Sequence, residues 1–171
     1  PTEIDADADA RQDAYTLGDT LGFDVSGKYL FGAPMKGVPL RYTLELESAY
    51  FRPRGSDGFD IDRWIWGEGA LPQLTTSDGT RVADVETEGS VSLDASGAAE
   101  VTWRPPVAQL PGPMRVELVA VLDDVTRQQG SAVTSALLHP GELYVGLRLP
   151  DEVLPHSTLR PEVAAFDHHG T

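Results

Sequence analysis

The chain has 171 residues, with 27 Asp and Glu against 13 Lys and Arg, which gives a formal net charge of −14. Such an acidic chain repels nucleic acid and anionic membrane surfaces, so we expect neither as a direct partner. The chain contains no cysteine, which excludes a disulfide scaffold, a zinc–thiolate site and a cysteine nucleophile.

Length and hydropathy limit the domain organisation. The length gives room for one domain of sandwich size, or for one such domain and part of another. No apolar run approaches the roughly 20 residues that span a bilayer, and no signal peptide is visible. Because the chain begins at Pro1 without a Met, we expect a processed or excised segment of a longer polypeptide.

Three aspartates alternate with alanines near the beginning of the chain, at Asp5, Asp7 and Asp9. This pattern predicts an edge strand whose charged side chains face water and discourage pairing with another chain. An EF-hand calcium loop does not fit. Such a loop needs Gly at its sixth and Glu at its twelfth position, where this chain has Ala10 and Thr16.

Residues 21–46 are predicted to form two strands joined by a sharp corner. Apolar residues alternate with polar or small ones, which places one set of side chains on a buried face. The alternating positions are Leu21, Phe23, Val25, Gly27, Tyr29 and Phe31, then Leu40, Tyr42, Leu44 and Leu46. Between them Gly32, Pro34 and Gly37 interrupt the sheet, because glycine accepts positive φ and proline lacks an N–H donor.

The next part of the chain combines loops with one short aromatic strand. Residues 49–63 contain Pro, Gly and an Asp-Gly pair, which predicts a loop with a hairpin-like corner. Trp64, Ile65 and Trp66 follow as a short strand, with both Trp side chains on one face and Ile65 on the other. Residues 67–89 are predicted to be rich in loops.

Four further strands are expected between residues 91 and 139. Their alternating residues are Val91 and Leu93; Ala99, Val101 and Trp103; Met114, Val116, Leu118, Ala120 and Leu122; and Val133, Ser135 and Leu137. The third strand also carries Val119 and Val121 beside Glu117, which predicts burial on both faces for part of its length. In total about seven or eight strands precede residue 141, spaced as in an antiparallel β-sandwich of the immunoglobulin or fibronectin III kind.

The last 30 residues behave as a separate unit. Two strands are predicted there, the first from Leu143, Val145 and Leu147 and the second from Leu159, Val163 and Ala165. Two strands do not form a stable sandwich alone. We therefore assign residues 1–141 to the sandwich domain and residues 142–171 to the first strands of an incomplete second domain, with a return onto the first domain as the alternative.

Few residues carry a metal-binding signature. Asp57, Asp60 and Asp62 offer oxygen ligands of the kind that calcium prefers, but an ordinary acidic loop explains them as well. The histidines are His139, His156, His168 and His169. Adjacent residues point to opposite faces of a strand, so we interpret His168 and His169 as a solvated chain end rather than a metal site.

Catalytic motifs are absent from the sequence. It contains no G-x-S-x-G nucleophile elbow, no Walker A loop and no dinucleotide fingerprint. We therefore expect no catalytic residue, no cofactor, no metal ligand and no enzymatic activity.

Aromatic residues suggest a different kind of function. Tyr50, Phe51, Trp64 and Trp66 form a platform for stacking on sugars if they lie on an exposed face, whereas a sandwich core also needs such rings. An independent binding module for carbohydrate or a protein ligand therefore stays open as an alternative.

Two motifs resemble the macroglobulin-like domains of bacterial alpha-2-macroglobulins. One is Tyr29-Leu30-Phe31-Gly32-Ala33-Pro34, followed by Gly37 and a strand, and the other is Leu143-Tyr144-Val145-Gly146-Leu147 at the junction into the next such domain. The resemblance runs in patches over most of the chain and is weakest in the acidic start and at residues 54–62. It implies a mid-chain sandwich of the N-terminal half, plus the first strands of its successor.

The resemblance also implies a function. Alpha-2-macroglobulins are broad-range protease inhibitors, in which cleavage of a bait segment triggers a rearrangement and a thioester between Cys and Gln captures the protease. Because this chain has no Cys, the implied role is a structural scaffold module without thioester chemistry. Apolar residues on outward faces, such as Leu30 and Ile65, would then form interfaces.

The implied partners are neighbouring macroglobulin-like domains of the same chain, and target proteases through the parent protein. The implied location is the periplasm or the cell surface, with a lipid anchor to the inner membrane upstream of Pro1.

Overall fold

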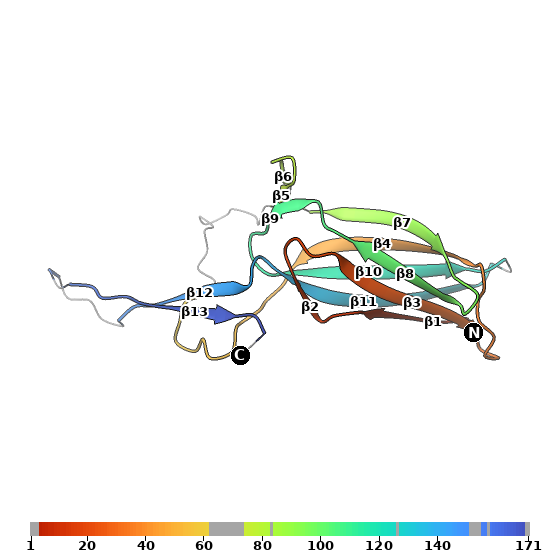
Figure 1. Cartoon of the computed structure of the whole chain (residues 1–171), viewed down its shortest axis with the longest axis horizontal. Helices are drawn as coiled ribbons and strands as arrows, with labels where there is room; N and C mark the ends of the chain where they lie inside the picture. Colours follow the sequence, from red (N-terminus) through yellow and green to blue (C-terminus); the bar gives the residue numbers. More distant parts are fainter. Residues whose placement is uncertain are drawn as a thin grey trace.

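The computed structural model describes residues 4–61, 74–82, 84–125, 127–150, 155–156 and 158–169. All regular structure in this part of the chain is β-strand (Figure 1), as predicted. The strands are β1 (Ile4–Ala10), β2 (Ala14–Thr16), β3 (Leu21–Tyr29), β4 (Pro39–Ser48), β5 (Leu74–Thr76), β6 (Arg81–Val82), β7 (Glu86–Ser92), β8 (Ala98–Trp103), β9 (Val107–Gln109), β10 (Met114–Asp123), β11 (Gln129–His139), β12 (Leu143–Arg148) and β13 (Glu162–Asp167). None of the described residues belongs to a helix long and apolar enough to cross a membrane.

In the described part of the chain, two facing sheets form a sandwich of eight strands, which agrees with the number predicted for the sandwich. One sheet has the strand order β1-β3-β8 and the other the order β2-β11-β10-β4-β7. Neighbouring strands are antiparallel, except that the short edge strand β2 runs parallel to β11. Figure 1 shows the two layers extended along the long axis of the molecule.

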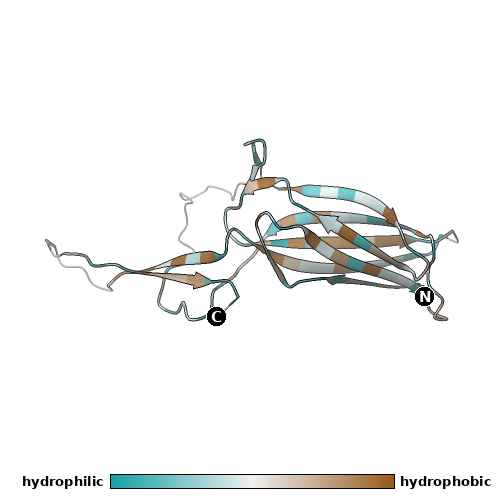
Figure 2. Ribbon diagram, viewed as in Figure 1, coloured by the Kyte–Doolittle hydropathy of each residue, from teal (hydrophilic) through white to brown (hydrophobic). Residues whose placement is uncertain are grey.

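The hydrophobic core lies between these sheets, because each strand turns one set of side chains inward. Phe23 of β3, Leu44 of β4 and Leu118 of β10 are fully buried. Figure 2 shows hydrophobic residues alternating with hydrophilic ones along these strands. Gly27 of β3 lies so close to β10 that a Cβ atom there would be 2.5 Å from Leu122 Cδ1. The layers therefore approach at a distance that only glycine permits at this point.

β10 is a central strand of the larger sheet, paired with β11 on one side and β4 on the other. Its inward residues from Met114 to Leu122 are buried, as predicted. The prediction that the opposite face is also buried is wrong, since Glu117, Val119 and Val121 are only half-buried. Their neighbours on β4 are polar side chains, which keep this face of the sheet in contact with water.

The corner between β3 and β4 differs from the predicted one. β3 ends at Tyr29, and Gly32 then adopts a φ of +92° and donates its N–H to the Tyr29 carbonyl oxygen at 2.8 Å. The prediction that Phe31 belongs to the buried face is therefore wrong. The turn directs Phe31 outward, where it is 81% exposed and stacks on the Tyr29 ring. Met35 fills the core at this corner instead.

β1 is an edge strand of the smaller sheet, as the alternating acidic pattern predicted. Asp5, Asp7 and Asp9 are exposed, whereas Ile4 and Ala8 are buried against the core. The charged side chains lie on the outer, water-facing face of this edge strand, where they hinder pairing with another chain.

The predicted side-chain phase of β11 is wrong by one residue. Ala136 and Leu138 are buried, whereas Val133 is exposed and Ser135 also faces water. The segment from Ser131 to Leu138 contains mainly small or weakly polar residues, so its own hydropathy does not distinguish the two faces. Pairing with β10 decides the phase.

The region predicted to be rich in loops contains more strand than expected. β5 and β6 form a small sheet with β9, in the order β6-β5-β9, and β7 begins at Glu86. Strands of two or three residues are too short to leave a periodic signal in the sequence. The predicted strand of Trp64, Ile65 and Trp66 lies outside the described residues.

β12 and β13 form an antiparallel hairpin, paired from Leu143↔Asp167 to Arg148↔Glu162. The two strands predicted after residue 141 are thereby confirmed, although the second begins at Glu162 rather than near Leu159. Figure 1 shows the hairpin projecting from one end of the sandwich.

Candidate functional site

The loop of residues 49–61 holds the hairpin in place. Asp60 and Leu147 exchange two backbone hydrogen bonds, at 2.8 and 3.0 Å, so the loop adds a β-bridge beside β12. Arg148 donates to the carbonyl oxygen of Asp57 at 3.0 Å. The segment in which the resemblance is weakest thus contains the contacts that position the hairpin.

Aromatic rings pack against the inner face of the hairpin. Phe166 of β13 meets Phe59 edge to face with ring centroids 5.3 Å apart, and Tyr144 of β12 lies 5.4 Å from Phe51. Gly146 lies beneath these rings, where a Cβ atom would be 2.8 Å from Phe166. Phe51 is therefore a packing residue in this structure rather than part of an exposed platform.

The outer face of the hairpin is apolar and exposed. It carries Leu143, Val145 and Leu147 of β12 and Val163 of β13, of which Val145 is 63% and Val163 64% exposed. Leu147 lies directly opposite Val163, so the apolar surface crosses both strands. A contiguous apolar surface of this kind is typical of a site that another protein segment covers.

A second apolar surface lies at the other end of the sandwich. Leu30 and Phe31 in the β3–β4 connection and Val125 in the β10–β11 turn are exposed. A hydrogen bond of 3.1 Å from Tyr29 Oη to Asp124 joins these two segments. Because β11 runs from this turn to the hairpin, the two apolar surfaces lie at opposite ends of the domain (Figure 1).

The junction between the sandwich and the hairpin contains three histidines. His139 ends β11, and His168 and His169 follow β13. The His168 ring stacks on His139 at 4.2 Å and lies 4.0 Å from His169, between centroids. His139 Nδ1 is 2.7 Å from Tyr144 Oη, and His168 Nε2 is 3.1 Å from Thr16 Oγ1. These contacts connect both strands of the hairpin to the sandwich.

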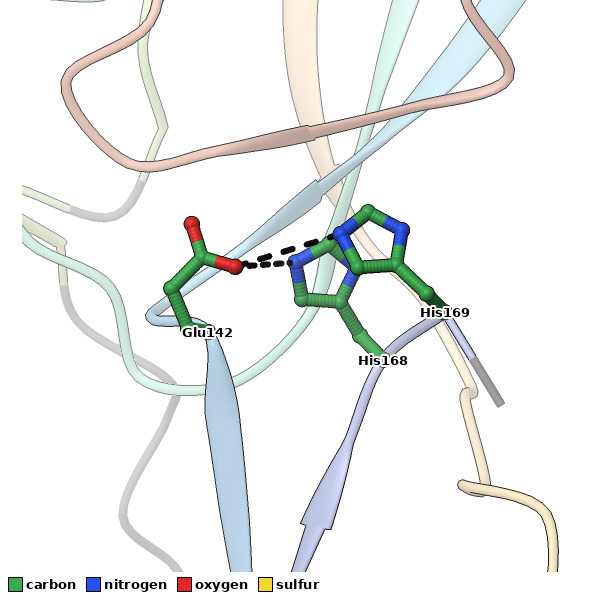
Figure 3. Close-up of side chains that lie close together, drawn as sticks. All are labelled: Glu142, His168 and His169. Atoms are coloured by element: carbon green, nitrogen blue, oxygen red, sulfur yellow. Dashed lines mark ion pairs between the residues drawn. The ribbon is translucent and has the colours of Figure 1, made fainter. Parts of the chain in front are cut away.

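Glu142 is the acidic neighbour of these rings. Its Oε2 atom lies 3.4 Å from His168 Nε2 and 3.9 Å from His169 Nε2 (Figure 3). Burial, reinforced by His168 and His169, lowers the pKa of His139 to about 4, although Glu142 acts in the opposite direction. His139 is therefore neutral at pH 7.

The interpretation of the terminal histidines as a solvated chain end is wrong for His168, whose side chain is only 1% exposed. β13 ends at Asp167, so both histidines lie in a bend rather than in a strand, and both rings face Glu142 (Figure 3). The sequence alone does not bring these histidines to Glu142, because their meeting depends on the register of the hairpin. If the last two strands pair with Leu143 opposite Asp167, Glu142 falls beside His168.

The other candidate residues are not brought together. Among the described residues, one group of three side chains is placed to share a metal ion, and it consists of Glu142, His168 and His169. Asp57 and Asp60 contact the hairpin through their backbones, while Asp62 lies outside the described part. His156 is exposed in the segment between β12 and β13, and Tyr50 is exposed beside the packed Phe51.

Comparison with solved structures identifies similar folds in two bacterial proteins. The chain matches trypsin-activated alpha-2-macroglobulin from Escherichia coli over 99% of its length, with a TM-score of 0.64 and 18% identity. It matches a mutant of Salmonella alpha-2-macroglobulin over 100% of its length, with a TM-score of 0.66 and 19% identity. The matched regions cover 12% and 11% of those two chains.

A sequence match points in the same direction. An alpha-2-macroglobulin homolog from Nostoc is 36% identical over 55 residues, which are 32% of this chain and 3% of that protein. No protein-family model matches the chain. The resemblance to bacterial alpha-2-macroglobulins is thereby confirmed in the β-sandwich fold and in one stretch of sequence.

Proposed function

We propose that the chain is a structural scaffold module of a bacterial alpha-2-macroglobulin-like protease inhibitor. One observation carries this proposal. The sandwich and the hairpin together match parts of two bacterial alpha-2-macroglobulins, yet they span only 12% and 11% of those chains. A module within such a protein contacts its neighbours, and apolar surfaces at both ends of this sandwich suit that purpose.

In this proposal residues 1–141 are the sandwich module, and residues 142–171 supply the first strands of a following macroglobulin-like domain. Two strands with an apolar outer face do not make a stable domain. Further strands that pack on Val145, Leu147 and Val163 would bury this face and complete a second core. The loop of residues 49–61 meanwhile sets the position of the hairpin.

The module has no catalytic role in this proposal. Its direct partners are neighbouring domains of the same polypeptide, and proteases meet the parent protein. The parent protein acts in the periplasm or at the cell surface, with its lipid anchor outside this segment.

The size of the native polypeptide tests the proposal. An antibody raised against the chain is used on the source cells before and after brief exposure to a protease. We expect a band far above 18.4 kDa that splits into discrete fragments. A band near 18.4 kDa would show a stand-alone protein and would favour an independent binding module.

The outer face of the hairpin tests the proposed domain boundary. Val145→Lys should destabilise the parent polypeptide, because a following domain would bury this side chain, but should leave the isolated chain nearly unchanged. Val133→Lys is the matched control, since Val133 is exposed on a sandwich strand. Equal tolerance of the two substitutions in the parent would contradict a domain that packs on the hairpin.

A further inference from the structure

The junction brings together three side chains that no part of the scaffold function uses. Glu142 lies just before β12, and His168 and His169 lie just after β13, so the hairpin register places them side by side. One ligand atom from each lies within 4.8 Å of the other two. Figure 3 shows both imidazole rings directed towards the carboxylate.

The distances suit a small transition-metal ion. Tetrahedral zinc with bonds of about 2.0–2.2 Å places neighbouring ligand atoms roughly 3.3–3.6 Å apart. Glu142 Oε2 is 3.4 Å from His168 Nε2 and 3.9 Å from His169 Nε2. Glu142 and His169 are both exposed, so they can close the remaining gap by small side-chain rotations while His168 stays in place.

Two further imidazole nitrogens are buried beside the cluster. His168 Nδ1 and His139 Nε2 are buried, and neither has a hydrogen-bond partner among the described residues. Neither atom is the one that faces Glu142, so the ligand atom that His168 offers is its Nε2. His168 is kept buried and fixed by its stack on His139. Its Nε2 atom lies 3.1 Å from Thr16 Oγ1 and 3.4 Å from Glu142 Oε2.

We propose that Glu142, His168 and His169 form a binding site for a zinc-type divalent ion, with the fourth position open to water. Two imidazoles and one carboxylate suit zinc, copper or nickel better than calcium or magnesium, which prefer oxygen ligands alone. The ion fastens the beginning of β12 to the end of β13 at the open end of the hairpin. Through His168, which contacts Thr16 and His139, it also fastens the hairpin to the sandwich.

The test is zinc binding by the full, tag-free chain after EDTA treatment and buffer exchange. Calorimetry should show one zinc ion per chain, and cobalt should give the visible absorption of a tetrahedral site. Glu142→Gln and His169→Ala should each weaken binding by at least about 10-fold, because changes even beyond the direct ligands cost that much. Both positions are exposed, and circular dichroism checks that the variants fold.

His156→Asn is the matched control. It removes an exposed histidine outside the cluster, and Asn tolerates the positive φ of 65° at this position. We expect unchanged zinc affinity in this variant. No zinc binding by the wild-type chain, or equal affinity in wild type, Glu142→Gln and His169→Ala, would overturn the site.

Hydrogen exchange tests the proposed attachment separately. Zinc should slow exchange of the backbone amides of β13 in the wild-type chain and leave them unchanged in His169→Ala. If zinc binds with the expected dependence on the three ligands but does not slow exchange in β13, the ion does not fasten the hairpin, and that part of the proposal is wrong.

Discussion

Strands of the sandwich and of the hairpin both alternate apolar residues with other residues. The sandwich strand β10 buries its aliphatic side chains, whereas the hairpin strand β12 exposes them. In β10 the apolar residues from Met114 to Leu122 face the second sheet and are buried. In β12 the apolar Val145 faces water, while Tyr144 and Gly146 pack against the loop of residues 49–61. Alternation therefore predicts a strand in both regions, whereas the neighbouring layer determines which face is buried.

Truncation of one leucine in each region should give the largest contrast. Leu118→Ala removes a fully buried side chain, and we expect a loss of about 2–5 kcal/mol in the free energy of unfolding. Leu143→Ala makes the same change on the exposed face of the hairpin and should alter that free energy by less than about 0.5 kcal/mol. Urea unfolding measures both. Similar losses would mean that the outer face of the hairpin is covered in the isolated chain.

Acidification should weaken the junction between the two regions. His139 has a pKa of about 4 in the folded chain against the ordinary value of 6.5. Between these values the unfolded chain binds a proton that the folded chain does not. Stability is therefore complete above about pH 6.5 and falls towards pH 4 by a total on the order of 3 kcal/mol. Urea unfolding across this range, with EDTA present, measures the loss.

The variant His139→Leu serves as the control for this pH dependence. It places an apolar side chain in the buried position and removes the titrating group, so its stability should depend less on pH between 4 and 6.5. The groups that face His139 are His168, His169 and Glu142. An undiminished pH dependence in His139→Leu would show that protonation of His139 does not cause it.

A larger side chain on the inner face should loosen the hairpin while the sandwich stays intact. Gly146→Ala places a Cβ atom 2.8 Å from the Phe166 ring, and such overpacking costs about 1–3 kcal/mol. Amides of β12 and β13 should exchange about 10-fold faster or more, whereas those of β10 keep their protection. Gly141→Ala is the control, because no heavy atom lies within 4 Å of the Cβ it would add. Equal loss of protection in β10 would show that the hairpin and the sandwich unfold together.

The smallest effect concerns the outer face of the larger sheet. Glu45 of β4 lies opposite Glu117 on one side and Glu86 on the other. Like charges directly opposite each other are unfavourable, so Glu45→Gln should raise stability by about 0.2–1 kcal/mol. The gain should shrink in roughly 1 M salt, which screens exposed charges. Glu47→Gln is the control, since Glu47 forms an ion pair with Arg115 and its loss should bring no gain.

The sandwich strands differ in how well the sequence predicted them. β3, β4 and β10 alternate large apolar residues with polar ones, so their inward residues were identified, except at Phe31, where Gly32 turns the chain before the alternation ends. In β11 the residues around Val133 and Ala136 are small or weakly polar. The set of side chains predicted to face the core was therefore the wrong one. A strand whose two faces resemble each other obtains its orientation from its partners rather than from its own residues.

The candidate sites depend even more than β11 on contacts between segments far apart in the sequence. The sequence shows His168 and His169 as a pair, and we interpreted them as a solvated chain end. In the structure the chain bends after Asp167, and His168 is buried against His139. Their meeting with Glu142 depends on the register of the hairpin, which no single residue encodes.

Local pattern and composition were sufficient to predict the all-β class, the acidic edge strand, the two final strands and the resemblance to bacterial alpha-2-macroglobulins. Each of these follows from residues that are neighbours in the chain. The exposed apolar face of the hairpin, the orientation of β11 and the histidine junction required the folded arrangement. Burial and register are relations between segments far apart in the sequence, and their free energy arises only when those segments pack together.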